Sequence, residues 1–417
     1  MIAVLVSLLT LLSPTQLGKH LWPSYTYLNG FKIDYLSPTL YFTDILLILL
    51  FLFNIKTLLK QVNKLSPLLK ISLITLPALN IIFAIQPLPA LIFWLRIFLL
   101  ISFIFSINSR PSLLKPIYYS LFTALIFTSL LTVAQFLLQS SLNGPLYFLG
   151  ERQLSAATAG IARLDLSQHL PFSLLPSTSL LLRPYATFSH PNSLAGFLLL
   201  SLGLIYLLNH KLKLSKHSLY VSFLTAIPAL LLTFSRTSLL TALIILPLLF
   251  LASHLSLLTK KIISLSIPAF SLLFSLPFVF PGLSGLQISN LAIQSRLFLN
   301  HSAVQVFANH PLLGTGLNNF LYALVKTNPQ IIYSLIQPAH NLFWLTLSQL
   351  GLVIFLPLIY YFLRFYFKLS FHLQLILAIV ILTGLLDHYW LTLPQNRLLL
   401  ALAISLLITL KNRSNLV

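Results

Sequence analysis

Four stretches of the chain place arginine, histidine and asparagine next to apolar segments, where these side chains could act on an anionic substrate. In the first stretch, residues 183–192, Arg183, His190 and Asn192 precede an apolar run, and Pro191 suits the first turn of a helix. The free N–H groups of a helix start, together with Arg183, can form an anion site. A helix cap with a structural arginine is the alternative interpretation of this stretch.

The second stretch, residues 233–238, is a tight turn between two apolar segments and carries Arg236 among four hydroxyl residues. An arginine in such a turn lies at the boundary between membrane and water, where ionisable residues are commonly functional. The alternative is an arginine whose side chain reaches the lipid headgroups. The pattern favours neither interpretation over the other.

The third stretch begins with Arg296 and continues through residues 301–320. His301 and Gln305 would share one face of a helix there. The Gly-Thr-Gly sequence at 314–316 predicts a turn and is weak evidence for phosphate binding. The functional interpretation of this stretch therefore depends mainly on Arg296.

The fourth stretch places His340 and Asn341 directly before another apolar segment. A histidine at the mouth of a helix can act as a general base near neutral pH, although a structural histidine is the commoner case. No histidine pair has the spacing of a zinc protease motif, and no carboxylate lies nearby in the sequence. We therefore expect neither a metal site nor a cofactor.

Composition indicates the class of protein that carries these stretches. Of the 417 residues, 58% are hydrophobic and 7% are charged, whereas a soluble domain has about 25% charged residues. The same composition excludes intrinsic disorder. The chain has no cysteine, which excludes disulfides, thiolate metal sites and thiol nucleophiles. We expect an all-α polytopic membrane protein, and the net charge of +20 is then explained by membrane topology rather than by nucleic acid.

Apolar runs of the length that crosses a bilayer predict about twelve transmembrane helices. We expect them at residues 1–12, 40–55, 68–85, 88–107, 116–140, 190–208, 218–233, 237–254, 262–280, 341–363, 372–390 and 396–410. The first is interpreted as a retained span, because it has no cationic leader and no cleavage site for signal peptidase. We see neither an internal repeat nor a linker, so residues 1–417 are expected to form one membrane domain.

The distribution of charge predicts the orientation of these helices. With the N-terminus and the C-terminus in the cytoplasm, the inner segments hold 15 cations and no acid, and 12 of those cations are lysines. The outer segments hold all five acids and the other ten cations, of which seven are arginines. The positive-inside rule favours this orientation. Because arginine binds phosphate through two parallel hydrogen bonds, the arginine-rich outer side suggests extracytoplasmic chemistry.

Two outer loops, about 141–189 and 281–340, are longer than ordinary connections, and such loops are usually functional or disordered. Both contain apolar and aromatic residues, glycines and scattered arginines, so we expect them to be folded. In the first loop, residues 166–170 and 172–175 could form a short interfacial helix.

Taken together, the four stretches resemble the O-antigen ligase and O-antigen polymerase superfamily of bacterial membrane glycosyltransferases. Members carry an Arg–x–x–(Gly/Ala)–Thr–Phe–x–His–Pro–Asn motif before a central span, matched by residues 183–192, and a Ser–Arg turn, matched by residues 235–236. A large outer loop opens with Ser–Arg and contains His–Pro–Leu–Leu–Gly–x–Gly, as residues 295–320 do. It closes with His–Asn at 340–341, followed by Gly351. Order, spacing and layout agree over most of the chain.

The resemblance implies a metal-independent, inverting transfer of a glycan from a polyprenyl (undecaprenyl) diphosphate carrier to an acceptor at the outer face of the cytoplasmic membrane. The arginines that bind the donor diphosphate and stabilise its departure would be Arg183, Arg236 and Arg296, the last two being essential to catalysis. His340 would take the proton of the acceptor hydroxyl or position that hydroxyl. Supporting roles would fall to His190, Asn192 and Asn341. The partners would be the lipid-linked donor, a glycan, lipid or protein acceptor, and membrane lipids.

Two alternatives remain open. Many relatives have glutamate where Gln349 stands and a small or polar residue where Ile354 stands, so ligase and polymerase are both compatible with the chain. A lipid-linked oligosaccharide flippase or another transporter is the alternative of a different class. Transporters favour ionisable residues near the middle of the membrane and often internal repeats, but here only Arg96 lies well inside an apolar run.

Overall fold

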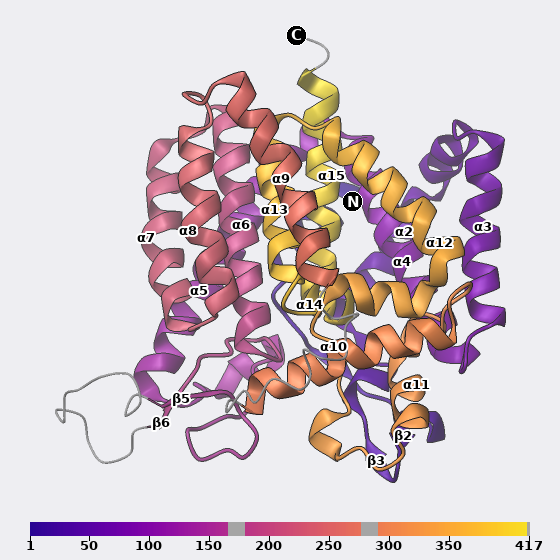
Figure 1. The fold of residues 1–417 in the computed structure, drawn as a ribbon. Helices are drawn as coiled ribbons and strands as arrows, with labels where there is room; N and C mark the ends of the chain where they lie inside the picture. Colours follow the sequence, from indigo (N-terminus) through magenta and orange to yellow (C-terminus); the bar gives the residue numbers. More distant parts are fainter. Residues whose placement is uncertain (166–179, 277–290, 415–417) are drawn as a thin grey trace.

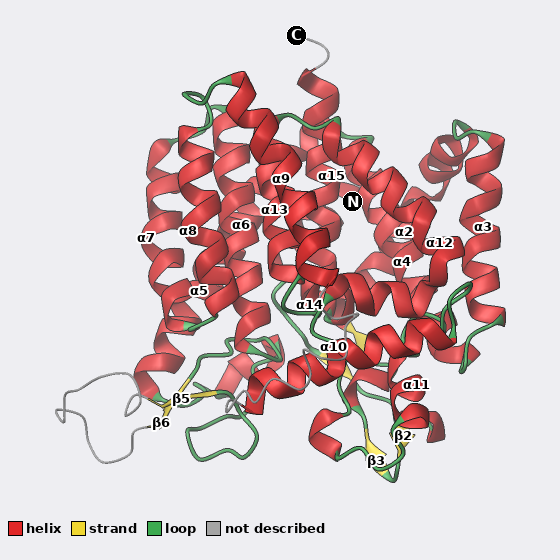
Figure 2. Cartoon of the chain, in the orientation of Figure 1, coloured by secondary structure: helices red, strands yellow, loops and turns green. Residues whose placement is uncertain are grey.

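The computed structural model describes residues 1–165, 180–276 and 291–414, and most of these residues are helical (Figure 1; Figure 2). The α-helices are α1 (Ile2–Leu11), α2 (Phe42–Asn63), α3 (Pro67–Ile82), α4 (Pro87–Asn108), α5 (Leu114–Leu138), α6 (Pro191–Leu212), α7 (Lys216–Leu232), α8 (Arg236–Leu251), α9 (Leu257–Ser275), α10 (Leu291–Asn309), α11 (Phe320–Thr327), α12 (Leu342–Phe367), α13 (Phe371–Gly384), α14 (Tyr389–Thr392) and α15 (Pro394–Ser414).

Six short strands form three antiparallel pairs at the outer ends of the helices. The pairs are β1 (Gly18–Lys19) with β4 (Leu40–Tyr41), β2 (Tyr27–Leu28) with β3 (Phe31–Lys32), and β5 (Arg163–Asp165) with β6 (Leu180–Leu182). Each pair is two or three residues long, so the strands fasten loops rather than build a core.

Each of the twelve segments expected from apolar runs corresponds to a helix of the structure. Within the described residues, six helices are long and apolar enough to cross a membrane: α2, α4, α5 with its preceding turn, α6, α9 and α12. Five further apolar helices are shorter, namely α1, α3, α7, α8 and α13. The chain is therefore a polytopic all-α membrane protein, while the number of twelve crossings stays a prediction.

Helix α6 lies at the centre of the bundle, between α5, α7, α8, α13 and α15 (Figure 1). Of its most apolar 18-residue window, 89% is buried by protein. Two glycines allow this close packing, because Gly196 faces the ring of Tyr389 and Gly203 faces two isoleucines of α13. The residues just before α6 are consequently held by a rigid element.

The short connections between helices and the long loops lie at opposite ends of the bundle. The turns at 64–66, 213–215, 252–256 and 368–370 lie at the end where the C-terminus emerges, and α10, α11 and the strands lie at the other end (Figure 1). This is the segregation that the lysine and arginine distribution led us to expect. Which compartment each end faces stays a prediction.

The second long loop is folded, as expected, in the part that the structure describes. Its main element is the 19-residue helix α10, which lies across the ends of the bundle helices (Figure 1). In the first long loop, residues 144–149 form a 3₁₀ helix and β5 pairs with β6. The interfacial helix expected at 166–175 falls outside the described residues.

The glycines of the second loop pack against a kink in α12. Gly351 has φ of +63° inside α12, and the helix lies across the bundle before this residue and runs along it afterwards (Figure 1). Four backbone hydrogen bonds join the kink to the loop, with N–H groups donating to carbonyls in the pairs 315→348, 316→349, 352→311 and 353→312. The Gly-Thr-Gly turn thus supports the helix that follows His340.

Replacing Gly351 by alanine should therefore destabilise the protein and reduce its function. A Cβ at this position would overlap the carbonyl oxygen of Leu312 and the amide nitrogen of Gly314, and the left-handed backbone adds strain of about 1–3 kcal/mol. Thermal unfolding of the purified protein measures the effect. Gly203→Ala is the matched control, because its Cβ would meet only the ends of flexible isoleucine side chains. Equal melting temperatures for both variants would contradict this account.

Candidate functional site

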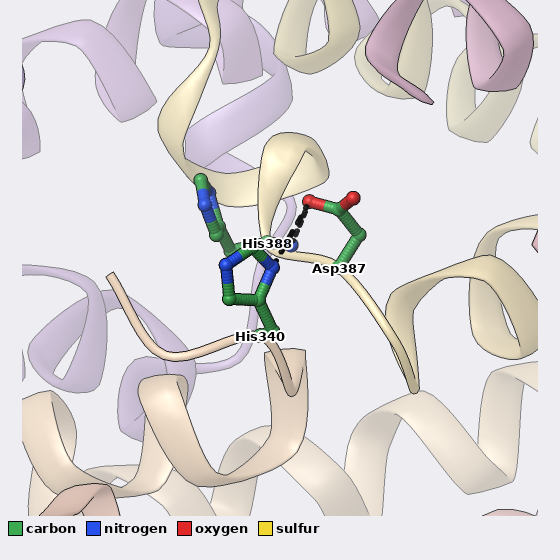
Figure 3. A group of neighbouring side chains, drawn as sticks. All are labelled: His340, Asp387 and His388. Carbon is green, nitrogen blue, oxygen red and sulfur yellow. Dashed lines mark hydrogen bonds and ion pairs between the residues drawn. The ribbon is translucent and has the colours of Figure 1, made fainter. Parts of the chain in front are cut away.

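Three ionisable side chains meet at the outer end of the bundle. His340 directly precedes α12, and Asp387 and His388 lie in the short link between α13 and α14 (Figure 3). His340 Nδ1 is 4.0 Å from Asp387 Oδ1, and the rings of His340 and His388 are 5.1 Å apart. Asp387 and His388 are buried, and the side chain of His340 is 15% exposed. We call these three residues the His–Asp cluster.

Asp387 is held in place by two donors. Its Oδ1 accepts the backbone N–H of His388 at 2.8 Å, and its Oδ2 accepts Nδ2 of Asn192 at 2.9 Å. Asn192 Oδ1 in turn accepts Nη2 of Arg183 at 2.8 Å. A continuous path of polar contacts therefore runs from Arg183 through Asn192 and Asp387 to His340.

Arg183 also fixes the turn that carries Arg236. Its Nε donates to the carbonyl of Thr233 at 2.8 Å, three residues before Arg236. Arg236 itself begins α8 with an exposed side chain, and Arg296 lies partly exposed on α10. The structure thus connects Arg183 to the His–Asp cluster through Asn192, places Arg296 near enough to act on His340, and places Arg236 near Arg183.

These arginines influence one another and the cluster electrostatically. Burial lowers the pKa of Arg183 to about 10, and the charges of Arg296 and Arg236 act in the same direction, although Tyr185 and Asp387 oppose it. The charge of Arg296 also lowers the pKa of His340. Within the part of the chain that the structure describes, none of these three arginines pairs with a carboxylate. The site is therefore short of negative charge and suited to a polyanion.

The protonation states of the cluster follow from burial and from the carboxylate. Burial lowers the pKa of His340 to about 3 against the opposing attraction of Asp387. Burial would raise the pKa of Asp387, but the three nearby histidines and the hydrogen bond from Asn192 lower it to about 2. At neutral pH His340 is neutral and Asp387 is ionised, so the imidazole has a free lone pair for a proton.

Two predicted supporting residues cap helices. His190 has an exposed side chain and accepts the N–H of Asn192 through Nδ1 at 3.1 Å at the start of α6. Asn341 accepts the N–H of Trp344 at 3.1 Å and donates to the carbonyl of Leu385 at 3.2 Å. Asn341 therefore ties the start of α12 to the end of α13, which sets the distance between His340 and Asp387.

Sequence reasoning missed Asp387 and His388, and the expectation that no cluster of histidines and carboxylates exists is wrong. One ligand atom from each of His340, Asp387 and His388 lies within 4.8 Å of the others, which is a grouping that could hold a metal ion. Asp387 is distant from His340 in sequence but near it in space, because α12 and α13 form a hairpin. The adjacent Asp-His pair between two apolar segments was the available signal.

The fold and the site together define a polytopic membrane protein with three arginines near a buried histidine and carboxylate, at the end of the bundle that carries the long loops. Residues 221–359, which include Arg236, Arg296 and His340, match the family model described as O-antigen ligase. This match confirms the resemblance to the O-antigen ligase superfamily. No curated protein matches the chain.

Because His340 is neutral when folded, and burial lowers the pKa of His388 as well, the stability of the protein should fall on acidification. Both pKa values are lowered by burial, so below pH 6.5 the unfolded chain binds more protons than the folded one. Going from pH 7 to pH 5.5 should cost about 1 kcal/mol for His340. Thermal unfolding of wild type and His340→Asn at the two pH values measures this, and the variant should lose less stability.

The control is His254→Asn, because His254 is exposed in the turn between α8 and α9. It should retain the wild-type pH dependence. An identical pH dependence in His340→Asn and wild type would show that His340 is not a neutral buried group.

Proposed function

We propose that the protein is a glycosyltransferase that moves a glycan from a polyprenyl diphosphate carrier to an acceptor hydroxyl. The observation that carries this proposal is the presence of three arginines without carboxylate partners near a neutral histidine, where Arg236, Arg296 and His340 lie in the segment that matches the O-antigen ligase family. The acceptor is a glycan, lipid or protein, so a polymerase that extends another glycan is the same reaction with a different acceptor.

The donor diphosphate is bound by Arg183, Arg236 and Arg296. Guanidinium groups form two parallel hydrogen bonds with phosphate oxygens, and three of them offset the charge of a diphosphate without a metal ion. Arg183 lies deepest and is fixed through Asn192 and Thr233, whereas the exposed side chain of Arg236 is free to follow the ligand. The polyprenyl chain packs against the apolar surface of the helices.

In the reaction, the acceptor oxygen attacks the anomeric carbon of the donor sugar from the side opposite the diphosphate. The new glycosidic bond forms as the bond between the anomeric carbon and the phosphate oxygen breaks, and the electron pair leaves with the diphosphate. The arginines stabilise this developing charge. The configuration at the anomeric carbon is inverted.

His340 accepts the proton of the acceptor hydroxyl. The ring is neutral before the reaction, and the carboxylate of Asp387, 4.0 Å from Nδ1, stabilises the imidazolium that forms. The bound diphosphate adds negative charge near the ring and raises its affinity for the proton. After transfer, the proton passes from His340 to solvent.

We propose that this reaction needs no metal ion. The charge on the leaving group is offset by arginines, and both oxygens of Asp387 already accept hydrogen bonds from the protein. A divalent cation held by the His–Asp cluster is the alternative that the geometry admits. The two mechanisms differ in their response to a chelator.

We place the site at the extracytoplasmic face of the cytoplasmic membrane. Lysine-rich connections gather at the opposite end of the bundle from the arginines and the His–Asp cluster (Figure 1). Cytoplasmic loops of membrane proteins carry the excess of lysine and arginine. The His–Asp cluster then faces the side on which lipid-linked glycans are used.

Arg236→Lys and Arg296→Lys should lose most transfer activity while the protein still folds and inserts. Lysine keeps the charge but cannot form the paired hydrogen bonds, and the loss of one such contact costs about 2–4 kcal/mol, or roughly 30- to 1,000-fold in rate. The assay incubates purified protein with a polyprenyl-diphosphate oligosaccharide and candidate acceptors. Lys213→Gln and Lys260→Gln at the opposite end are controls with unchanged turnover. Wild-type rates in both arginine variants would contradict diphosphate binding.

His340→Ala should suppress transfer by about 100- to 10,000-fold and leave binding of the lipid-linked donor largely unchanged, because a positioned base acts on the acceptor. His301→Ala and His310→Ala should have milder effects, since neither histidine belongs to the His–Asp cluster. The same assay with chelator present should show full wild-type activity. Inhibition by the chelator would favour the metal alternative, and an active His340→Ala variant would exclude histidine as the base.

A further inference from the structure

A cavity of about 410 Å³ opens beside the His–Asp cluster, and the proposed reaction uses none of the three arginines in its lining, Arg96, Arg152 and Arg397. The cavity lies between the segment 16–41, the outer part of α4, residues 147–152 and the start of α15. Its arginines on helices are Arg96 of α4 and Arg397 of α15. Arg183, Arg236, Arg296 and His340 do not line it. The cavity is therefore distinct from the arginine site for the donor.

Arg397 is the unusual member of the lining. The residue is 8% exposed, and its Nε and Nη1 are buried without a hydrogen-bond partner in the described residues. The face of Phe93 lies 4.8 Å from the guanidinium carbon. Taking a guanidinium out of water without a partner is costly, so a buried arginine of this kind normally binds an anion.

Arg96 does not need such an anion. Its Nη2 donates to the carbonyl of Thr39 and to Asp44 Oδ2, the latter at 3.1 Å, and its guanidinium lies 5.5 Å from the ring centre of Tyr41. Asp44 is hydrogen-bonded to Arg96, although its charge also acts on Arg397. The lining includes the carboxylates of Asp34 and Glu151 and the guanidinium of Arg152 as well, so what sets Arg397 apart is its unpartnered donors rather than the net charge of the cavity.

The cavity is directly connected to the His–Asp cluster. Thr392, which lines it, is 2.7 Å from Nδ1 of His388 through its Oγ1. Tyr35, another lining residue, packs its ring edge-on against His388 at 5.6 Å. A molecule in the cavity would consequently lie next to His388, whose ring is 5.1 Å from that of His340.

We infer that this cavity binds the acceptor and that Arg397 binds a phosphate or carboxylate group on its sugar. The inference rests on the proposed function, because it assigns the acceptor side of the same site. The guanidinium offers a pair of donors that matches either anion. Tyr25, Tyr35 and Tyr41 add rings with hydroxyl groups, which suit the apolar faces and hydroxyls of a sugar.

The test measures binding and needs no transfer. Purified full-length protein in phosphatidylcholine nanodiscs is titrated with glucose 6-phosphate, methyl glucuronoside and methyl glucoside, and dissociation constants are obtained from ligand-observed NMR. Wild type should bind at least one anionic sugar about tenfold more tightly than the uncharged glucoside. Comparison of the two anionic sugars distinguishes phosphate from carboxylate. Equal binding of all three sugars would overturn the inference.

Three variants test whether Arg397 causes the preference for an anionic sugar. Arg397→Gln should abolish it, Arg397→Lys should weaken it, and Lys326→Gln, which removes an exposed cation of α11 outside the cavity, should retain it. Without sugar, the melting temperature of Arg397→Gln should be no lower than that of wild type, because an unpaired buried charge is removed. The preferred anionic sugar should raise the melting temperature of wild type but not of Arg397→Gln. A lower melting temperature without sugar would make Arg397 a structural residue.

A phosphate of a membrane lipid is the competing occupant. Replacing half of the phosphatidylcholine by phosphatidylglycerol should leave binding of the anionic sugar unchanged, and loss of binding would assign the cavity to a lipid headgroup. The result of this binding experiment can be distinguished from the result of the transfer assay. Active protein without an anionic preference refutes this inference alone, whereas inactive protein that binds anionic sugar at Arg397 refutes the transfer alone.

Discussion

The carboxylate of Asp387 is the interaction on which the outer end of the bundle depends. In an apolar chain with five acidic residues, a buried carboxylate must be fully satisfied, and Asn192 and the His388 N–H provide its hydrogen bonds. Those contacts bring the start of α6 to the link after α13. Through Asn192 they also orient Arg183. One negative charge therefore fixes the position of Arg183 relative to His340.

The bundle packing gives this arrangement its rigidity. Helix α6 is enclosed by five neighbours, so its first turn cannot shift without disturbing the core. The start of α12 is held from two directions, by Asn341 at the cap and by the loop 311–316 at the kink. In contrast, Arg236 and Arg296 extend from surface positions. The site thus combines residues held by buried hydrogen bonds with two arginines that are at least partly exposed to solvent.

The helices were predictable from the sequence, and the site was predictable only in part. Apolar runs of bilayer length identify the helices, because each must bury its own backbone polar groups in lipid. The local motifs singled out Arg183, Arg236, Arg296 and His340, and their roles in the reaction stay predictions. Asp387 could not be placed beside His340, because their proximity depends on how α12 and α13 pack. The unpaired guanidinium of Arg397 was equally invisible, since the sequence does not reveal which partners a buried charge lacks.

The side chain at position 349 decides whether a group that titrates lies beside the kink of α12. Gln349 is buried beside the kink. Its side-chain Nε2 donates to the backbone carbonyl of Leu345 at 3.0 Å, and its backbone carbonyl accepts a hydrogen bond from Nδ2 of Asn80 at 2.9 Å. An amide neither gains nor loses a proton, whereas the glutamate of many relatives would be an acid in an apolar environment. The hydrogen bonds that Gln349 makes at this bend therefore do not depend on pH.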